Sequence, residues 1–343
     1  MSKLVTTNGM IILDDIQTVE GDHYTDVIGG AGTYAIISAS MVCPGASEWI
    51  VDRGHDFPPE VTHTIDGWDS GAVFCDDPNR MTTRGSNIYG ANDLRKFEYL
   101  TPKKQITVRD WVEHFGEGNV SQLRCFHLVC SPARVLEIFD DLCKVSGYRR
   151  NNATFVWEPL PDSMVPENVG VIQQILNRDE HVILSPNAEE GARMFGEAEP
   201  LDIDGCAALI RRFGTIMKPG NSCVLRCGKL GSIVLREAPG REVHTAPAYH
   251  AATQDQVVDP TGGGNAFLGG FCMAYALIGD LQVANMCGSV TAGCAIEQIG
   301  PCKLDSRTRR INDKLTFQVR LAHFIYAYGL RYNAAHICSQ LQR

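Results

Sequence analysis

The chain lacks the features that identify membrane, secreted and nucleic-acid-binding proteins. None of its apolar runs approaches the roughly 20 residues that a membrane-spanning helix needs, so no contact with a membrane is expected. Residues 1–8 contain no apolar core after the lysine, which argues against a secretory signal. The formal net charge is −9 and the one basic cluster, at residues 307–310, is short, so no nucleic-acid partner is expected.

Paired cysteine motifs are missing as well, although the chain contains 13 cysteines. Cys125 and Cys130, like Cys223 and Cys227, are spaced as residues on strands rather than as the CxxC pairs of zinc sites. We therefore expect reduced and mostly buried thiols in a cytoplasmic or nuclear protein. The sequence also has no Gly-x-Ser-x-Gly motif, which argues against the common hydrolase elbow.

What is present is an ordinary globular composition on a chain of 343 residues, 44% hydrophobic and 21% charged. From residue 125 onward, segments typical of strands alternate with segments typical of helices, which predicts a mostly parallel sheet covered on both faces. Ligands of such sheets bind beyond the carboxyl ends of the strands. The expected strands are 125–130, 153–157, 182–184, 223–227 and 232–235. The expected helices are 168–176, 188–195, 203–213, 265–279 and 283–297, followed by a long helical tail.

The N-terminal part is less regular. We expect a strand region at residues 3–13 that ends at Asp14, a helix at 33–41 and a strand that ends at Asp52. Residues 55–108 are rich in Pro, Gly, Asp, Asn and Thr, and they predict a small antiparallel flap or lid. The flap is expected to be an insertion in a single domain that spans residues 1–343.

The most informative segment is 257–267, where two valines are expected to end a strand, three glycines form a turn and an apolar helix begins. This arrangement aims unpaired amides and the positive end of the helix dipole at an anion, and glycine allows the anion to approach closely. Asp259 and Thr261 flank the turn with oxygen atoms that could hold hydrated Mg²⁺. A phosphate site is therefore predicted at Gly262, Gly263 and Gly264.

Two weaker features belong to the same end of the predicted sheet. Asn187 and Glu190 are three residues apart at a helix start and could face one site, although taken alone they favour a capping box. Gly228 and Gly231 frame a turn between two strands, for which a plain hairpin is the simpler interpretation. Lys229 could reach a phosphate but lacks the glycine spacing of a Walker A loop.

In their order along nearly the whole chain, these segments resemble the ribokinase-like, or PfkB, family of carbohydrate and nucleoside kinases. The chain also looks similar to a fungal group of ribokinase-like proteins involved in killer-virus maintenance. The resemblance implies a ribokinase-like three-layer α/β/α sandwich with a mostly parallel sheet and a small β-lid. It also implies ATP or ADP as ligand, together with Mg²⁺.

The resemblance implies a role for each matched residue. The pocket for a sugar-like or nucleoside acceptor would be lined by Asp14, Gly29 and Gly30. The residues that organise nucleotide, metal and phosphate would be Asn187, Glu190, Gly228, Gly231, Asp259 and Thr261. Of these, Glu190 and Asp259 would hold Mg²⁺ through water. The anion hole for the transferred phosphoryl group would be Gly262, Gly263 and Gly264, and the helix at 284–294 would lie beside the adenine.

Two departures from the family pattern bear on activity. The family ends its second signature with an aspartate that acts as general base, and this chain has Asn265 there. An amide cannot accept the proton, and loss of general-base assistance typically lowers a rate by ~10²–10⁴. Tyr34 stands near the usual position of an asparagine that shapes the sugar pocket, and a phenol would shrink or redirect that pocket. The sequence therefore predicts nucleotide binding with crippled phosphotransfer, in a degenerate kinase or an interaction protein.

Alternatives remain open at this point. An active kinase would need a relocated base, for which Asp259 and His250 are the nearest candidates in the sequence. An NAD-binding protein is suggested by Gly30, Gly32 and Ala35 in the Gly-x-Gly-x-x-Ala pattern, with Asp52 about 20 residues later. A homodimer formed through the lid, or another protein partner, is also compatible with the sequence.

Overall fold

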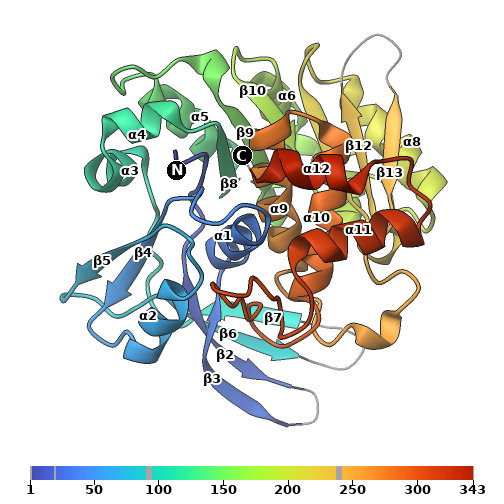
Figure 1. Cartoon of the computed structure of the whole chain (residues 1–343). Helices are drawn as coiled ribbons and strands as arrows, with labels where there is room; N and C mark the ends of the chain where they lie inside the picture. The colour runs from blue at the N-terminus through green and yellow to red at the C-terminus, as the bar shows by residue number, and fades with distance from the viewer. Residues whose placement is uncertain (1, 19–20, 90–94, 237–241, 343) are drawn as a thin grey trace.

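The computed structural model describes residues 2–18, 21–89, 95–236 and 242–342, and its largest element is a seven-stranded sheet (Figure 1). From one edge to the other the sheet consists of β1 (Val5–Thr7), β8 (Cys125–Cys130), β9 (Thr154–Pro159), β10 (His181–Leu184), β11 (Ser222–Arg226), β12 (Ser232–Arg236) and β13 (Val243–Ala246). The first five strands are parallel, whereas β12 and β13 are antiparallel to their neighbours. The predicted mostly parallel sheet is therefore present.

Each face of the sheet has its own hydrophobic core because successive residues of a strand point to opposite sides. Val156 of β9 and Ile183 of β10 belong to one core, while Phe155, Trp157 and Leu184 on the same strands belong to the other. The helices of the first core are α1 (Ala31–Val42), α2 (Pro59–Asp66), α9 (Gly263–Ile278), α10 (Leu281–Ala295), α11 (Phe317–Ala327) and α12 (Ala334–Leu341). Those of the second are α3 (Val108–Phe115), α4 (Glu117–Gln122), α5 (Pro132–Leu142), α6 (Val169–Leu176), α7 (Ala188–Met194) and α8 (Ile203–Gly214).

The expected strand region at 3–13 is divided between two sheets. β1 lies at the edge of the large sheet, and β2 (Ile12–Gln17) belongs to a four-stranded sheet in the order β3-β2-β6-β7. The other members of this small sheet are β3 (His23–Gly29), β6 (Arg84–Tyr89) and β7 (Arg95–Tyr99). Asp14 therefore lies within β2, not at the end of the first strand as expected. The reason is that residues 8–11 turn the chain out of the large sheet after only three paired residues.

The small sheet projects from the main body (Figure 1) and occupies a different range from the predicted flap. The predicted range of 55–108 supplies β6 and β7, and β2 pairs with β6 and β3 from the N-terminal side. Residues 90–94 of that range lie outside the described residues. The remainder of the range forms α2 and β5 (Ala72–Asp77), which pairs in parallel with β4 (Trp49–Gly54).

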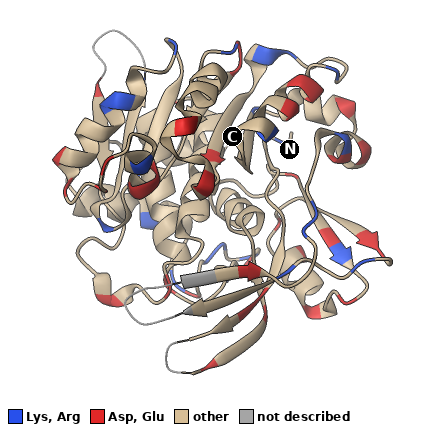
Figure 2. Ribbon diagram, turned by 180° about the vertical axis from the view of Figure 1, so that it is seen from behind, with Lys and Arg blue, Asp and Glu red and all other residues tan. Residues whose placement is uncertain are grey.

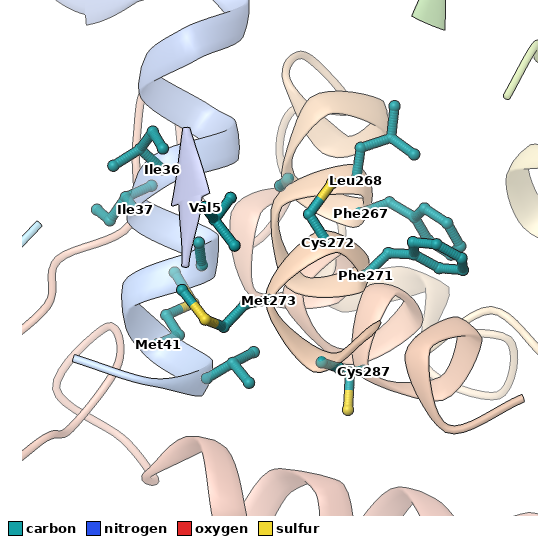
Figure 3. Packing of buried hydrophobic residues seen from close by; sticks show 14 of the residues in the cluster. Val5, Ile36, Ile37, Met41, Phe267, Leu268, Phe271, Cys272, Met273 and Cys287 are labelled. Atoms are coloured by element: carbon teal, nitrogen blue, oxygen red, sulfur yellow. The ribbon is translucent and has the colours of Figure 1, made fainter. Parts of the chain in front are cut away.

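Helix α9 is held between α1 and α10, so its first turn has a fixed position (Figure 3). A Cβ on Gly269 of α9 would overlap the carbonyl oxygen of Ala35 in α1, so the two helices touch backbone to backbone. On the other side, the hydroxyl of Thr291 donates to the carbonyl oxygen of Ala266 over 2.9 Å. The buried side chains in Figure 3, among them Ile36, Phe271 and Met273, fill the space around these contacts. The glycine turn before α9 is thus attached to a rigid core.

The predicted helical tail consists of two helices, α11 and α12, which begin at the caps Thr316 and Asn333.

Acidic and basic residues are interspersed over the molecule (Figure 2). In the described part of the chain, no helix combines the length and the apolar character needed to cross a bilayer. Short 3₁₀ turns lie at Arg150–Asn152, Pro161–Ser163, Pro166–Asn168, Gly228–Leu230 and Gln254–Gln256.

Candidate functional site

The glycine turn is present, but the strand expected before it is not. Gly262 is the N-cap of α9 and adopts a left-handed conformation with φ of 77°, which glycine tolerates at little cost. Val258 is 60% exposed and lies in no strand. Its N–H and that of Asp259 donate to the carbonyl oxygen of Ile296, over 2.8 and 3.3 Å. The two valines form no strand, because the N–H of Val258 donates to the end of α10 and that of Val257 to the carbonyl oxygen of Gln254.

Two side chains lie against Gly262 and Gly264 of the turn. A Cβ on Gly262 would overlap the ring of Tyr34, which is 5% exposed and lies against the turn. A Cβ on Gly264 would overlap Nη1 of Arg226, at the end of β11. Any residue larger than glycine would displace these neighbours. The turn therefore has Tyr34 on one side and a guanidinium group on the other.

Asn265, at the predicted base position, is already engaged in a hydrogen bond. Its Nδ2 donates to Oε2 of Glu158 over 2.5 Å, and Oε1 of the same carboxylate lies 2.7 Å from Nη1 of Arg226. Nε2 of the buried His127 is 3.7 Å from Oε2 of Glu158. Burial alone would raise the pKa of Glu158, but Arg226 and His127 together lower it below its usual value. The carboxylate is thus ionised and occupied on both oxygen atoms.

The sequence interpretation overlooked Glu158, Arg226 and His127, although a signal for them exists. Each is a titratable residue inside or at the end of an otherwise apolar strand, on β9, β11 and β8 respectively. Charged side chains in such strands are seldom buried without a partner. Because the carboxyl ends of β9 and β11 share one edge of the sheet, Glu158 and Arg226 could have been paired.

Asn187 and Glu190 form the capping box that the spacing favours. Oδ1 of Asn187 accepts the N–H of Glu190 over 2.7 Å, and Oε2 of Glu190 accepts the N–H of Asn187 over 2.9 Å. Burial raises the pKa of Glu190, and Nη2 of Arg226 lies 3.7 Å from its Oε2. The pair therefore serves as a helix cap that also borders the guanidinium group.

A cavity of about 440 Å³ brings together Asn187, Gly228 and Gly231 of the predicted nucleotide residues and two of the three anion-hole glycines. It lies beside the β11–β12 hairpin, where Gly228 and Gly231 have φ of 54° and 97° and so form the predicted turn. Its polar and cationic lining includes Asn187, Arg226, Lys229 and His250. The cavity is also lined by Gly228, Gly231, Gly263, Gly264, Ser289 and Gly293. The last two belong to the helix predicted to lie beside the adenine. Gly262, Asn265, Glu190, Asp259 and Thr261 do not line the cavity.

The residues predicted to hold Mg²⁺ do not fit that ion well. Oδ1 of Asp259 accepts the N–H of Thr261 over 2.9 Å, and Asp259 is only 6% exposed. Oε2 of Glu190 is used in the helix cap and faces Arg226. Magnesium prefers carboxylates that are open to it in an octahedral shell. Among the residues that the structure describes, no group of three or more His, Cys, Asp or Glu side chains could hold a metal ion.

The predicted acceptor residues do not line the nearest cavity, although residues beside them do. Asp14 is 7% exposed, and its carboxylate lies between Gly29 and Gly85, because a Cβ on either glycine would press against it. A second cavity, of about 330 Å³, opens beside the carboxyl ends of β1, β8 and β9. Its lining includes the neighbouring residues Gly9, Ile12, Ala31, Tyr99, Lys103 and Arg134, but not Asp14, Gly29 or Gly30.

The structure contradicts the alternative of an NAD-binding fingerprint. Such a fingerprint requires a strand, a glycine turn and a helix within a parallel βαβ unit. The strand before Gly30 is β3, which pairs antiparallel with β2 in the small sheet. Asp52, the expected ribose ligand, lies on β4 and is 3.6 Å from Nζ of Lys104.

Comparisons with known proteins identify the family of the chain and its fold. The model of the pfkB family of carbohydrate kinases matches residues 98–308. Protein MAK32 of Saccharomyces cerevisiae is 45% identical over 352 aligned residues, which cover 99% of this chain and 97% of that protein.

Two solved structures show the fold. A ribokinase from Giardia lamblia superposes with a TM-score of 0.69 at 16% identity, covering 95% of this chain and 99% of that one. The ribokinase of Arabidopsis thaliana, solved with ribose and ATP, has a TM-score of 0.63 at 15% identity and covers 88% and 95%. The predicted ribokinase-like α/β fold is confirmed.

Proposed function

The chain belongs to the PfkB family of carbohydrate kinases, as its sequence suggested, and on that basis we propose that it binds an adenine nucleotide but transfers its phosphate poorly or not at all. The observation that carries this proposal is the hydrogen bond between Asn265 and Glu158. At the position of the family's general base, the side chain is an amide that donates to a neighbour. It has no capacity to take a proton from an acceptor hydroxyl.

Retained nucleotide binding is supported by the cavity of about 440 Å³. Its size lies within the usual range for small-molecule sites, and it combines apolar walls with a few convergent polar groups. Gly263 and Gly264 border it at the N-terminus of α9, where the helix dipole favours an anion, although the N–H of Gly263 already donates to the carbonyl oxygen of Pro260 over 3.2 Å. Lys229 and Arg226 add positive charge to the same lining. These features suit the phosphates of ATP or ADP.

No relocated base is favoured by the geometry. Glu158 is the carboxylate beside Asn265, but its two oxygens already accept from Arg226 and Asn265, and its lowered pKa makes it a weak base. His250 is 3% exposed, and its Nε2 lies 3.5 Å from Glu297. Asp259 caps the turn through the N–H of Thr261. Each candidate therefore performs a structural task.

The position of Tyr34 also supports weak or absent phosphotransfer, because it affects the approach of the acceptor. Its ring covers Gly262, where the hydroxyl of an acceptor would have to approach the phosphate. Phosphoryl transfer depends on an in-line approach of the attacking oxygen, so a side chain in that path lowers the rate independently of the missing base.

Thermal stabilisation by ATP, ADP and NAD at millimolar concentration tests the proposal. A ligand present at about 100 times its dissociation constant stabilises the folded state by roughly 2.7 kcal/mol, which is a measurable shift. We expect ATP or ADP to raise the midpoint and NAD to leave it unchanged. If no nucleotide raises the midpoint, the proposal is wrong, and a role as an interaction protein built on a kinase fold takes its place.

Localisation and partners remain predictions. A cytoplasmic or nuclear location, and a homodimer formed through the predicted lid or another protein partner, rest on the sequence argument alone. Sedimentation of the full chain at several concentrations would test the dimer, and the proposal of nucleotide binding does not depend on it.

A further inference from the structure

Arg226 occupies an unusual position for a cation in a phosphate site. It ends β11, and its side chain is only 12% exposed. Nη1 lies so close to the helix start that a Cβ on Gly264 would overlap it. The guanidinium group therefore lies beside the backbone amides that are expected to bind the terminal phosphate, and it lines the nucleotide cavity.

Two carboxylates and a carbonyl hold this guanidinium group in place. Nη1 is 2.7 Å from Oε1 of Glu158, and Nη2 is 3.7 Å from Oε2 of Glu190. Nη2 also donates to the carbonyl oxygen of Ser185 over 3.1 Å. The buried Nε has no hydrogen-bond partner among the residues that the structure describes, so the group keeps an unused donor. An arginine fixed by its acidic neighbours is pre-organised to meet an anion.

The same two carboxylates are the ones that a divalent cation in the place of this guanidinium group would meet. Glu158 and Glu190 converge from the ends of β9 and the start of α7, and the positive charge between them is that of Arg226. A metal ion at this point would have to displace the guanidinium group and then compete with the cap of α7 for Glu190. The arginine and the metal therefore exclude one another.

We propose that Arg226 is the resident cation of the phosphate site and that the chain binds ATP or ADP without Mg²⁺. The inference rests on the proposed nucleotide-binding function and specifies how the phosphate charge is balanced. Guanidinium groups stay charged at any physiological pH and bind phosphate oxygens through paired N–H donors. Lys229, which lines the same cavity, supplies a second positive charge.

Calorimetric titration of ATP and ADP into the full chain, with Mg²⁺ and with EDTA, tests the proposal. The dissociation constant of the unaltered chain is expected to agree within about threefold between the two buffers. Arg226→Met should bind at least about tenfold more weakly in EDTA, which corresponds to losing one charged hydrogen bond. Mg²⁺ should restore much of its affinity, because Oε1 of Glu158 then has no guanidinium partner and can face the metal.

Two further variants keep the test interpretable. Arg226→Lys retains the charge, so it should bind in EDTA more tightly than Arg226→Met and should fold if the latter does not. Arg193→Met is the matched control: this arginine on α7 also pairs with a carboxylate, that of Glu189, and donates to backbone carbonyls, but it does not line the cavity. Its affinity should equal that of the unaltered chain in both buffers.

The outcomes separate this inference from the function on which it rests. Binding that requires Mg²⁺ in the unaltered chain contradicts the role of Arg226 and leaves nucleotide binding intact. Equal affinity of Arg226→Met and the unaltered chain in EDTA contradicts it as well. If neither nucleotide binds in either buffer, both the inference and the proposed function are wrong.

Discussion

The two sides of the glycine turn differ in what they leave open. On the side of α10 and the β11–β12 hairpin, a cavity of about 440 Å³ reaches Gly263 and Gly264. On the side of α1 and β9, Tyr34 covers Gly262, and Asn265 is bonded to Glu158. The nearest cavity on that side, of about 330 Å³, reaches none of the three glycines.

This difference indicates that binding and chemistry can be lost separately in one site. Nucleotide binding needs the amides of the helix start and a cavity with positive charge, and both are still present. Phosphotransfer would also need a base and an open path for the acceptor, and we propose that Asn265 and Tyr34 occupy these two places. The following variants either open the closed side or damage the open one.

The largest expected effect on stability follows from changing Glu297, which lies beside the cavity residue His250. Glu297 is 3% exposed, and its oxygens accept from Arg320 over 2.6 and 3.1 Å and from Lys314 over 3.1 Å. Its Oε1 also lies 3.5 Å from His250, a cavity residue. Glu297→Gln leaves Arg320 buried without a counter-charge and should lower the free energy of unfolding by about 3–5 kcal/mol, measured with urea. Glu189→Gln, an exposed carboxylate paired with Arg193, is the control and should change stability by less than about 1 kcal/mol.

The same residue gives a pH dependence with a definite sign. Burial alone would raise the pKa of Glu297, but hydrogen bonds from His250, Arg320 and Asn312 lower it well below its usual value of 4.5. A lowered folded-state pKa means that the stabilisation is complete above about pH 4.5 and declines as the pH falls toward the folded-state value. Urea midpoints between pH 3 and 7 should therefore fall on the acid side, with a smaller slope for Glu297→Gln. Equal slopes for the two proteins would contradict this account.

Removing the ring of Tyr34 should lower the stability of the protein without changing its affinity for the nucleotide. Tyr34→Ala removes the ring that lies on Gly262 and should lower the unfolding free energy by about 3–5 kcal/mol, as for other large buried aromatic residues. The dissociation constant for ADP should change by less than about threefold, because Tyr34 does not line the nucleotide cavity. A much larger change in ADP affinity would show that the two sides are not separable.

Exchanging the carboxylate and the amide of Glu158 and Asn265 tests the contact between these two residues. Asn265→Asp alone would place a second carboxylate 2.5 Å from Oε2 of Glu158, so repulsion should destabilise the protein. Adding Glu158→Gln returns the site to one negative charge. A double-mutant cycle in urea should therefore give a favourable coupling of about 0.5–3 kcal/mol. Additive effects of the two substitutions would contradict the contact.

The smallest expected effect on stability is that of Asn187→Ala, which tests whether Asn187 only caps α7 or also binds the nucleotide. Asn187→Ala removes the cap of α7 and should lower the unfolding free energy by about 0.5–2 kcal/mol. Because Asn187 also lines the cavity, we expect ADP affinity to fall about tenfold. Asp202→Ala removes a comparable cap from α8, outside the cavity, and should lower stability without changing affinity. Equal affinities for the two variants would limit Asn187 to its capping role.

Most of the fold could be predicted because its signals are local. The apolar segments that became β8 to β12 and the cap Asn187 each depend on residues close together in the chain. The division of residues 3–17 between two sheets could not be predicted, because it depends on pairing with β6 and β8. Val258 forms no strand for the same reason, since its partner is Ile296 at the end of α10.

The candidate site was predictable in part. The glycines, Asn187 and the hairpin turn were found from spacing, and the cavity brings most of them together. The pairing of Asn265 with Glu158 joins residues 107 positions apart, so no local pattern contains it. Arg226 was overlooked because the motif beside it draws attention to Gly228 and Gly231, although the nearby arginine faces the same cavity.

Binding and turnover measured on one sample test the central claim most directly. ATP would be titrated calorimetrically into the full chain, and ADP would then be quantified after addition of a panel of sugars and nucleosides. The account predicts saturable binding of one ATP per chain and no acceptor-dependent ADP above that in protein-free controls. Rapid acceptor-dependent ADP formation by the unaltered chain would contradict the claim that the side of Tyr34 and Asn265 is closed to chemistry.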